Sequence, residues 1–363
     1  MTTISDIAKK ANVSRTLVSR VLNNKPGVSP ENRQKILSIM EETHYVPSGL
    51  ARSLVTQKTG AIGVIMDELC NEFFLKLIAG LLTEAVLNHT NIRTIGLCNC
   101  PINMINDMSQ KFSCSTDDLF LDFVGINHLI WAQKVLLRGK DVTAEAIEKI
   151  CDASSKEIMA NIPEVHYSPE FLRSLGMIPV SYLKYYYLQP QMLEECLADS
   201  KSKGVRGEVV KGVESELFTL YQDTDLKEKP EQLARRGGAR YSDAACSLID
   251  SIYNNKKDIQ VVNVMNSGCN LDLPENAVIE RNCVIDSNGA HPIQIGHTPL
   301  KIRGLLQNVK AYEQLTIQAA IYGDRDAALQ ALTIHPLVNS AETARLMLND
   351  ILRENQAFLP NFA

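Results

Sequence analysis

Apolar and polar positions follow a helical period through the first 22 residues. Apolar side chains recur three or four positions apart from Ile4 to Ala11, Asn12 interrupts the run, and a second helical pattern begins at Ser14. This second pattern has an apolar face and a polar face. The apolar face holds Leu17, Val18, Val21 and Leu22, and the polar face holds Arg15, Thr16, Ser19 and Arg20. The pattern predicts two short helices joined by a tight turn.

A third amphipathic helix is predicted from about Pro30 to Thr43, with Ser29 as its N-cap. Two short helices, of which the second has Arg and Thr on its exposed face, are typical of a helix-turn-helix. In that motif the second helix enters the DNA major groove. In that interpretation the arginines read guanine, and the hydroxyl groups with Asn23 hold phosphates. A plain three-helix bundle with charged outer faces fits the same pattern.

Farther along, the pattern changes to alternating helices and strands. Residues 83–90 (TEAVLNHT) predict a helix, Arg93–Cys98 (RTIGLC) a buried strand, and the following CNCPIN a loop. Asp122–Val135 is another strand-like apolar run, and Ala341–Asn355 is predicted as a helix. We expect an all-helical head followed by an α/β (α+β) body. The strand Arg93–Cys98 is of the parallel type, and Ala61–Met66 could pair with it.

Charge supports this division. Residues 1–60 hold nine Lys and Arg against four Asp and Glu, whereas the remainder holds 28 basic and 38 acidic residues. A basic head before an acidic body suggests that only the head faces a polyanion. The nine cysteines show no C-x-x-C pair, which favours reduced core residues over a disulfide scaffold. Because we find neither a secretory signal nor a long apolar run, we expect a cytoplasmic protein with no membrane span.

Two residues of the body are candidates for metal binding. Cys98 ends the predicted strand and His128 lies in the next apolar run, and a thiolate and an imidazole are both competent ligands. The alternative is that both are ordinary core residues, with Cys100 and Cys114 as bystanders. Tyr241 precedes Ser242 and Asp243, so its simplest interpretation is a helix start.

The N-terminal sequence ISDIAKKANVSRTLVSRVLNNKPGVSPENRQKI, followed by HYVPSGLARSLVTQKTGAIGVIM, resembles the lactose-repressor (LacI/GalR) family from Thr3 to about Gly80. The resemblance implies operator DNA as a partner. By it, Arg15, Thr16 and Arg20 read bases, Ser14, Ser19 and Asn23 contact the backbone, and Pro47–Val55 is a hinge helix with Leu54 as a minor-groove wedge. Ser48 departs from the family's usual Asn, which weakens the expected hinge.

From about Leu82 to the C-terminus the chain resembles glycoside hydrolase family 4, in its 6-phospho-β-glucosidase branch. The segments that carry the resemblance are GLCNCPINM, GINHLIWA, RRGGARYSDAA, NSGCNLDLPENAVIE and ALTIHPLVNSAETARLMLNDILRENQAFLP. The family implies NAD and Mn²⁺ or another divalent metal as cofactors and a 6-phospho-sugar as substrate. It oxidises C3 of the sugar with NAD⁺, so that a base can remove the C2 proton and the aglycone can leave C1.

The same resemblance assigns roles to residues of this chain. Cys98 and His128 would be the metal ligands, Tyr241 the C2 base, and Asn127 would lie near the metal and the sugar hydroxyls. Asn99 stands where relatives that act on α-linked substrates usually show Asp, and it therefore favours β-linked 6-phosphoglucosides. Both families imply a homo-oligomer.

The dinucleotide-binding turn is missing. No G-x-G-x-x-G occurs in the 363 residues, and repressor-like sequence stands where the NAD-binding half would be. We therefore expect an incomplete Rossmann-type sheet and absent or impaired glycoside cleavage. The predicted domains are 1–46 (DNA-binding head), 47–60 (hinge), 61–80 (first strand and helix of a repressor core) and 82–363 (family 4 C-terminal part). A fusion of two genes is our first hypothesis, a regulator that senses a phosphorylated sugar or metal the second, and an active enzyme the third.

Overall fold

The computed structural model describes residues 4–22, 26–43, 94–152, 162, 165–236 and 241–362. The chain divides into two units, residues 1–60 and 61–363, and each is described by itself. Several predicted features lie outside the described residues. These are Asn23, the hinge Pro47–Val55 with Leu54, the strand Ala61–Met66 and the helix at residues 83–90.

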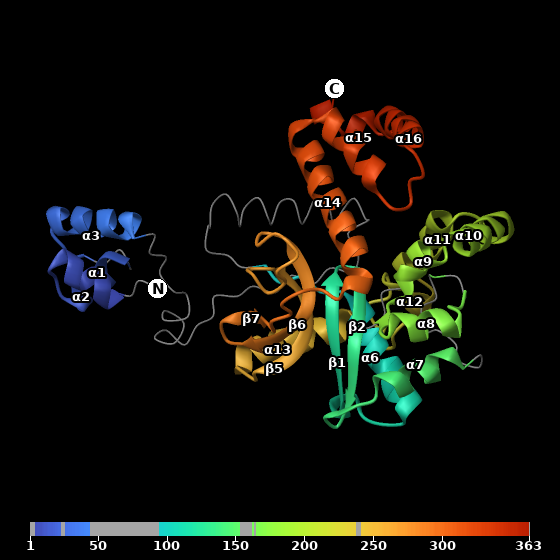
Figure 1. Ribbon diagram of the computed structural model, residues 1–363, viewed down its shortest axis with the longest axis horizontal. Helices are drawn as coiled ribbons and strands as arrows, with labels where there is room; N and C mark the ends of the chain where they lie inside the picture. Colours follow the sequence, from blue (N-terminus) through green and yellow to red (C-terminus); the bar gives the residue numbers. More distant parts are fainter. Residues whose placement is uncertain are drawn as a thin grey trace. The chain divides into compact units, whose positions relative to one another are not determined.

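Three helices form the described part of the first unit (Figure 1): α1 (Ile4–Ala11), α2 (Arg15–Leu22) and α3 (Pro30–Glu42). Their small core contains Ile7, Ala8, Ala11, Val18, Val21 and Ile36. Asn12 turns the chain with a left-handed φ of 55°, and the Ser14 Oγ accepts the Leu17 N–H at 3.2 Å to cap α2. The three predicted helices are confirmed.

An antiparallel sheet forms the centre of the second unit. Its strands lie in the order β3 (Lys140–Asp141), β2 (Leu129–Leu137), β1 (Leu119–Ile126), β6 (Val278–Asp286) and β5 (Asp258–Met265). Two short strands, β4 (Ile178–Pro179) and β7 (Gly289–Pro292), pair with β2 and β6. Phe123 of β1 and Trp131 of β2 are fully buried in its core. The predicted mixed helix-and-sheet class is confirmed.

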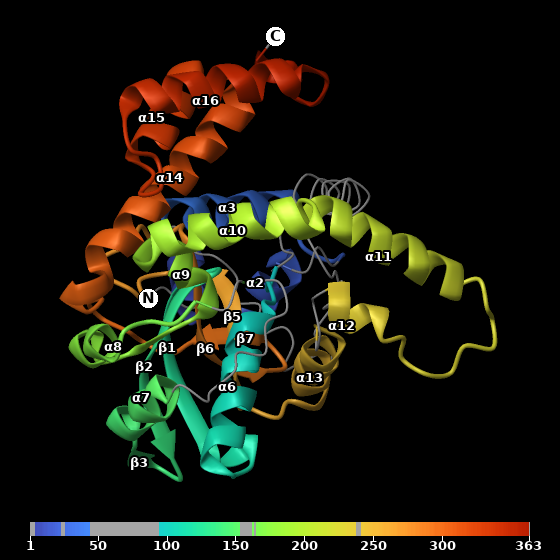
Figure 2. The ribbon, with the colours of Figure 1, turned by 90° about the vertical axis from the view of Figure 1, so that its right-hand side faces the viewer.

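Helices cover this sheet and extend beyond it. Helices α6 (Asn99–Phe112), α7 (Thr143–Cys151) and α13 (Tyr241–Asn254) pack against β1, β2 and β6 respectively. Figure 2 shows α14 (Leu300–Tyr322), α15 (Arg325–Ile334) and α16 (Ala341–Glu354) stacked together at the C-terminal end. Between α7 and α13, the described residues form the helices α8 (Pro169–Leu175), α9 (Lys184–Tyr187), α10 (Gln189–Lys203), α11 (Arg206–Leu220) and α12 (Gln232–Arg236). The observed α16 confirms the predicted C-terminal helix.

The predicted strand Arg93–Cys98 is wrong. Of the described residues 94–98, only Gly96 pairs with the sheet, through an isolated antiparallel bridge to Asn263. Helix α6 begins directly afterwards, at Asn99. All strand pairs of the described sheet are antiparallel. Ile95, Gly96 and Leu97 are half-buried beside the sheet, and β-branched and small residues alone do not require a full strand.

The predicted single run Asp122–Val135 is two strands. Chain reversal at Asn127 and His128 makes β1 and β2 a hairpin, with Ile126 opposite Leu129. His128 adopts a left-handed φ of 63°. Asn127, the preceding residue, is of a type that is favoured in two-residue hairpin turns. The apolar residues on both sides of it made the segment resemble a single strand.

No helix in the part of the chain that the structure describes is long and apolar enough to cross a membrane.

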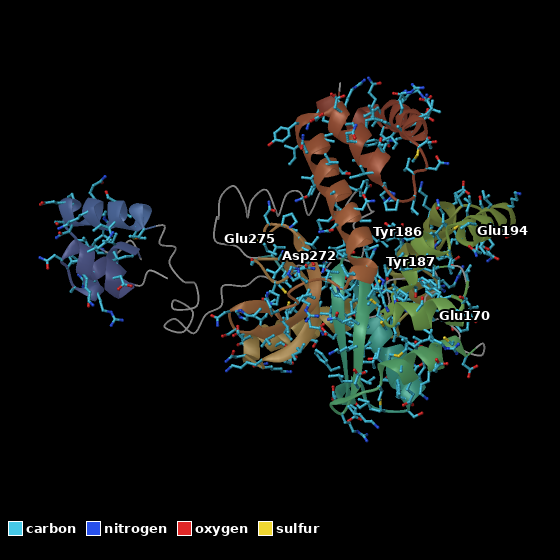
Figure 3. All side chains as sticks on the ribbon, viewed as in Figure 1. Glu170, Tyr186, Tyr187, Glu194, Asp272 and Glu275 are labelled. Carbon is cyan, nitrogen blue, oxygen red and sulfur yellow. The ribbon has the colours of Figure 1, made fainter. Side chains whose placement is uncertain are left out.

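Asp272 anchors the loop between β5 and β6 (Figure 3). It accepts the Thr298 N–H at 2.6 Å and pairs with His297 Nδ1 at 3.0 Å and Arg303 Nε at 3.1 Å. Burial raises the pKa of the Asp272 carboxyl group, but the contacts with His297, Thr298 and Arg303 lower it more, so the net pKa lies below the usual value.

We expect Asp272→Asn to lower the free energy of unfolding of the second unit by about 1–2 kcal/mol at pH 7. Because the folded pKa lies below the unfolded one, the carboxylate stabilises the fold above an unfolded pKa of about 3.9, and this contribution is lost as the pH falls through the folded value. Trp131 is the single tryptophan, so its fluorescence during urea unfolding follows this unit. A difference from wild type that does not shrink toward acid pH would contradict this account.

Candidate metal centre

Cys98 lies where an extended segment meets helix α6. It is the N-cap of α6, with φ −131° and ψ 143°, and its side chain is buried. Two residues earlier, Gly96 exchanges both backbone hydrogen bonds with Asn263 of β5, at 2.9 and 2.8 Å. A Cβ on Gly96 would lie 3.0 Å from the Cβ of Asn263, so glycine permits this close approach. The bridge holds Cys98 against the sheet.

His128 occupies the turn of the β1–β2 hairpin. Its ring stacks on Tyr182, with ring centroids 4.4 Å apart and planes at 17°. Gly125, in β1, has no room for a side chain, because a Cβ there would lie 2.2 Å from the Leu129 carbonyl oxygen and 2.6 Å from the Ile130 Cα. The tight hairpin and the stacked tyrosine together fix the position of the imidazole.

The ligand atoms of Cys98, Cys100 and His128 all lie within 4.8 Å of one another. Cys100, which the sequence suggested was a bystander, is therefore part of the cluster. Its position follows from local geometry, since an extended N-cap followed by the first helical turn brings the side chains of residues 98 and 100 together. The C-x-C spacing was the signal, but two cysteines so close in sequence can equally point apart on a regular strand or helix.

Glu280 lies fully buried beside this cluster. It is opposite Gly125 on β1 and opposite Asn263 on β5, and Asn263 Nδ2 donates to its Oε1 at 3.3 Å. Its other oxygen, Oε2, has no hydrogen-bond partner of ordinary geometry among the described residues. Burial, and then the nearby Cys98, raise the pKa of Glu280 well above its usual value.

The Cys98 thiol is held protonated when no cation is near. Its hydrogen bond with Cys100 and its burial raise its pKa, and His128 lowers it by a smaller amount. Two buried sulfurs and a buried carboxyl oxygen thus lie beside the imidazole of the exposed His128. Unsatisfied buried polar atoms are costly, and a bound cation is one way to satisfy them.

A family profile and a curated relative identify the family of the larger part of the chain. The profile of the Family 4 glycosyl hydrolase C-terminal domain matches residues 123–338. The probable 6-phospho-beta-glucosidase of Bacillus subtilis (strain 168) is 40% identical over 326 residues, which cover 87% of this chain and 73% of that protein. The chain belongs to glycosyl hydrolase family 4.

Two further family 4 relatives match a similar share of this chain. The 6-phospho-beta-glucosidase of Escherichia coli (strain K12) is 37% identical over 308 residues, covering 82% of this chain and 68% of that enzyme. A 6-phospho-beta-glucosidase of Thermotoga maritima, solved with manganese, NAD+ and glucose-6-phosphate, matches with a TM-score of 0.65 and 33% identity. That match covers 77% of this chain and 65% of the solved one, so the chain spans slightly less than two thirds of that relative.

The N-terminal part belongs to a second family. The profile of bacterial regulatory proteins of the lacI family matches residues 3–48. The sucrose operon repressor of Pediococcus pentosaceus is 42% identical over 96 residues, which are 26% of this chain and 28% of the repressor. The chain therefore joins a LacI-family domain to a family 4 glycosidase domain.

Most of the residues predicted to contact DNA lie on or next to α2. Ser14 caps the helix, and the side chains of Arg15, Thr16 and Arg20 are exposed, while Ser19 is half-buried. Gly27 lies close to the Arg20 guanidinium, because a Cβ on Gly27 would meet its Nη1 at 2.8 Å. Exposed arginines on the second helix are compatible with the predicted DNA contacts, which stay a prediction.

The remaining predicted site residues of the family 4 body lie in different places. Asn99 is the buried first residue of α6 and lies between Cys98 and Cys100, and Asn127 is exposed in the hairpin turn next to His128. Tyr241 is on a separate element, as the half-buried first residue of α13, which packs against α6. The structure thus joins Cys98 with His128, and adds Cys100 and Glu280, which the sequence did not single out.

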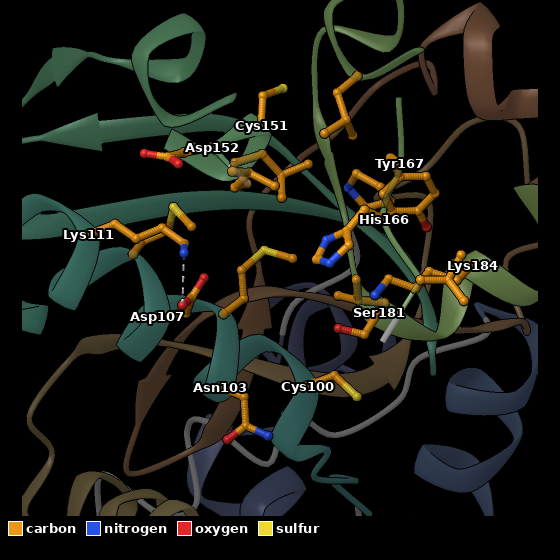
Figure 4. Close-up of a pocket in the computed structure, with 18 of the residues that line it drawn as sticks. Cys100, Asn103, Asp107, Lys111, Cys151, Asp152, His166, Tyr167, Ser181 and Lys184 are labelled. Atoms are coloured by element: carbon orange, nitrogen blue, oxygen red, sulfur yellow. Dashed lines mark ion pairs between the residues drawn. The ribbon is translucent and has the colours of Figure 1, made fainter. Parts of the chain in front are cut away.

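A cavity of about 360 Å³ lies next to the cluster along α6 (Figure 4). Cys100 contributes to its wall, so the cavity and the cluster share a residue. Asp107 and Lys111, paired at 3.4 Å, line one side, and His166, Ser181 and Lys184 line another. The rest of the lining is mostly apolar, so these few polar groups could orient a small molecule that enters beside the sulfur cluster.

Proposed function

We propose that this chain binds DNA through its LacI-family domain, and that its family 4 body binds a divalent metal ion and a 6-phosphorylated sugar without cleaving glycosides by the NAD-dependent route. The observation that supports this most directly is the gathering of Cys98, Cys100 and His128 within 4.8 Å in the body. The sugar class comes from the relatives, which are 6-phospho-beta-glucosidases.

The donor set of the cluster fits a divalent metal ion. Thiolate and imidazole are established ligands, and the unsatisfied Glu280 Oε2 beside Cys98 indicates a place where positive charge would be stabilised. Cys98 and His128 would hold the ion, which when bound acts as a Lewis acid on sugar hydroxyls. Asn99 and Asn127, their chain neighbours, would orient the sugar by hydrogen bonds. Tyr241 is the residue that would serve as the C2 base if cleavage took place.

The described residues do not fit NAD. A dinucleotide site needs a parallel strand that leads through a glycine-rich turn into a helix, with the pyrophosphate at the helix N-terminus. The strands of the sheet described between residues 94 and 362 are all antiparallel, and G-x-G-x-x-G is absent from the whole sequence. Without hydride transfer to NAD⁺, the C2 proton keeps its ordinary, weak acidity.

DNA binding is tested with the full-length chain and a randomised duplex library, since the operator is unknown. After rounds of selection we expect one enriched sequence, bound with an affinity that falls as salt rises. Arg15→Ala should weaken binding to that duplex by about 1–3 kcal/mol, or roughly fivefold to 150-fold. Lys35→Ala, an exposed cation on α3, is the control and should bind nearly as well as wild type. Failure to enrich any sequence would overturn the DNA-binding part of the proposal.

The body is tested by calorimetry and by turnover. Glucose 6-phosphate should bind in the presence of metal and bind more weakly after EDTA treatment. Release of nitrophenol from 4-nitrophenyl 6-phospho-β-D-glucoside with NAD⁺, Mn²⁺ and reductant should not exceed the blank. Turnover by wild type that disappears in Tyr241→Phe would show an active enzyme and overturn the proposed loss of cleavage.

A further inference from the structure

Cys100 brings a second sulfur to the family 4 site. Cys98 and Cys100 are both buried, lie two residues apart at the start of α6, and place their Sγ atoms and a nitrogen of His128 within 4.8 Å of one another. Among the described residues, this is the one group of three or more His, Cys, Asp or Glu side chains close enough to share an ion. We propose that Cys100 is a third protein ligand of the metal ion and that the site prefers zinc to manganese. This inference rests on the metal binding proposed above.

The spacing suits a small tetrahedral ion. Zinc lies about 2.3 Å from sulfur and about 2.0 Å from nitrogen, so its ligand atoms are roughly 3.4–3.8 Å apart. Atoms already within 4.8 Å reach that spacing by side-chain rotation. The three residues leave one tetrahedral position open, which is the arrangement of zinc sites that also bind a water molecule or a substrate oxygen.

The ligand types favour zinc as well. Two thiolates and an imidazole are soft to intermediate donors that suit zinc, whereas manganese is better matched by carboxylate, carbonyl and water oxygens. A site with one cysteine and one histidine leaves most of the coordination to oxygen. When the Cys100 sulfur replaces one of these oxygen ligands, the set of donor atoms becomes better suited to zinc than to manganese. Cys100 therefore decides which metal the site selects.

The fold holds the ligands in place before any ion binds. The Gly96–Asn263 bridge fixes the chain two residues before Cys98, and helix α6 fixes Cys100. The Tyr182 ring supports His128 from the other side. Glu280 adds a buried carboxyl group beside Cys98, and its Oε2 has no hydrogen-bond partner of ordinary geometry among the described residues. Supporting contacts of this kind orient metal ligands.

The experiment is a cobalt titration of the reduced full-length protein, because cobalt reports sulfur ligands through a charge-transfer band in the near ultraviolet. Wild type should show a band of two-thiolate intensity, and Cys100→Ser about half of that. Excess zinc should remove the band, whereas the same amount of manganese should leave it. In competition titrations, Cys100→Ser and Cys100→Val should each lower the preference for zinc over manganese at least about tenfold.

Two controls separate ligand loss from misfolding. Cys114→Ser, which replaces a half-buried cysteine beyond the end of α6, should keep the full band. The Cys100 variants should keep the Trp131 emission of wild type. Unchanged band intensity and metal preference in both Cys100 variants, with the band abolished in Cys98→Ser, would overturn the role of Cys100 and leave the proposed metal binding intact. Absence of any cobalt band in wild type would overturn both.

Discussion

Replacement of Gly125 by alanine is expected to destabilise the second unit by about 3 kcal/mol or more and to abolish metal binding. The added methyl group would lie 2.2 Å from the Leu129 carbonyl oxygen and 2.6 Å from the Ile130 Cα, both of them backbone atoms. Because backbone cannot rotate away as a side chain can, β1 and β2 must separate. The separation would displace His128, three residues further along the chain.

Urea unfolding followed by Trp131 fluorescence measures the first effect, and the cobalt band measures the second. Gly212→Ala is the matched control, since its Cβ would meet nothing within 4 Å inside helix α11. That change should leave the stability unchanged or raise it by up to about 1 kcal/mol. If the Gly125→Ala protein is as stable as wild type and keeps its cobalt band, the hairpin does not require a residue without a side chain at position 125.

Removal of the Asp122 carboxylate is expected to lower the free energy of unfolding by about 3–5 kcal/mol, because it leaves a buried cation without its counter-charge. Arg281 is 3% exposed and bonds through Nη1 to Asp122 and to the Phe123 carbonyl, while its Nε donates to the Ile293 carbonyl at 2.8 Å. The pair joins β1 to β6, the two strands that carry Gly125 and Glu280.

Asp122→Ala is compared with Asp199→Asn, which removes an exposed ion pair to Lys203 on α10. Solvent screens that surface pair, so its loss should be small. The urea midpoint of Asp122→Ala should fall well below those of wild type and Asp199→Asn. Equal midpoints for the two variants would show that Arg281 finds other partners when Asp122 is absent.

The helical head was fully predictable where the structure describes it. Helices α2 and α3 have their own capping residues, Ser14 and Ser29, and buried residues such as Val18 mark an apolar face. Helix α16 was predictable for the same reason, with Ser340 as its cap and a period of apolar residues behind it. Such signals are local, so they can be found without knowledge of the neighbouring elements.

The sheet was predicted less well. The segment ending at Cys98 has strand-like composition, yet only Gly96 pairs with a strand, because α6 begins immediately after it. Composition reports that a segment is buried and leaves open which partner buries it. The hairpin at His128 was hidden for a similar reason, since continuous apolar character on both sides of the turn resembles one long strand.

The sequence by itself determined the two families, the helices of the head, and Cys98 with His128 as candidate ligands, since these follow from local patterns and motifs. Tertiary structure alone decided that the Cys98–Cys100 pair meets His128 and that Glu280, more than 150 residues away, lies beside Cys98. The physical reason is that strand pairing and helix packing set these distances. They depend on the register between β1, β5 and β6, which no single segment of the sequence specifies.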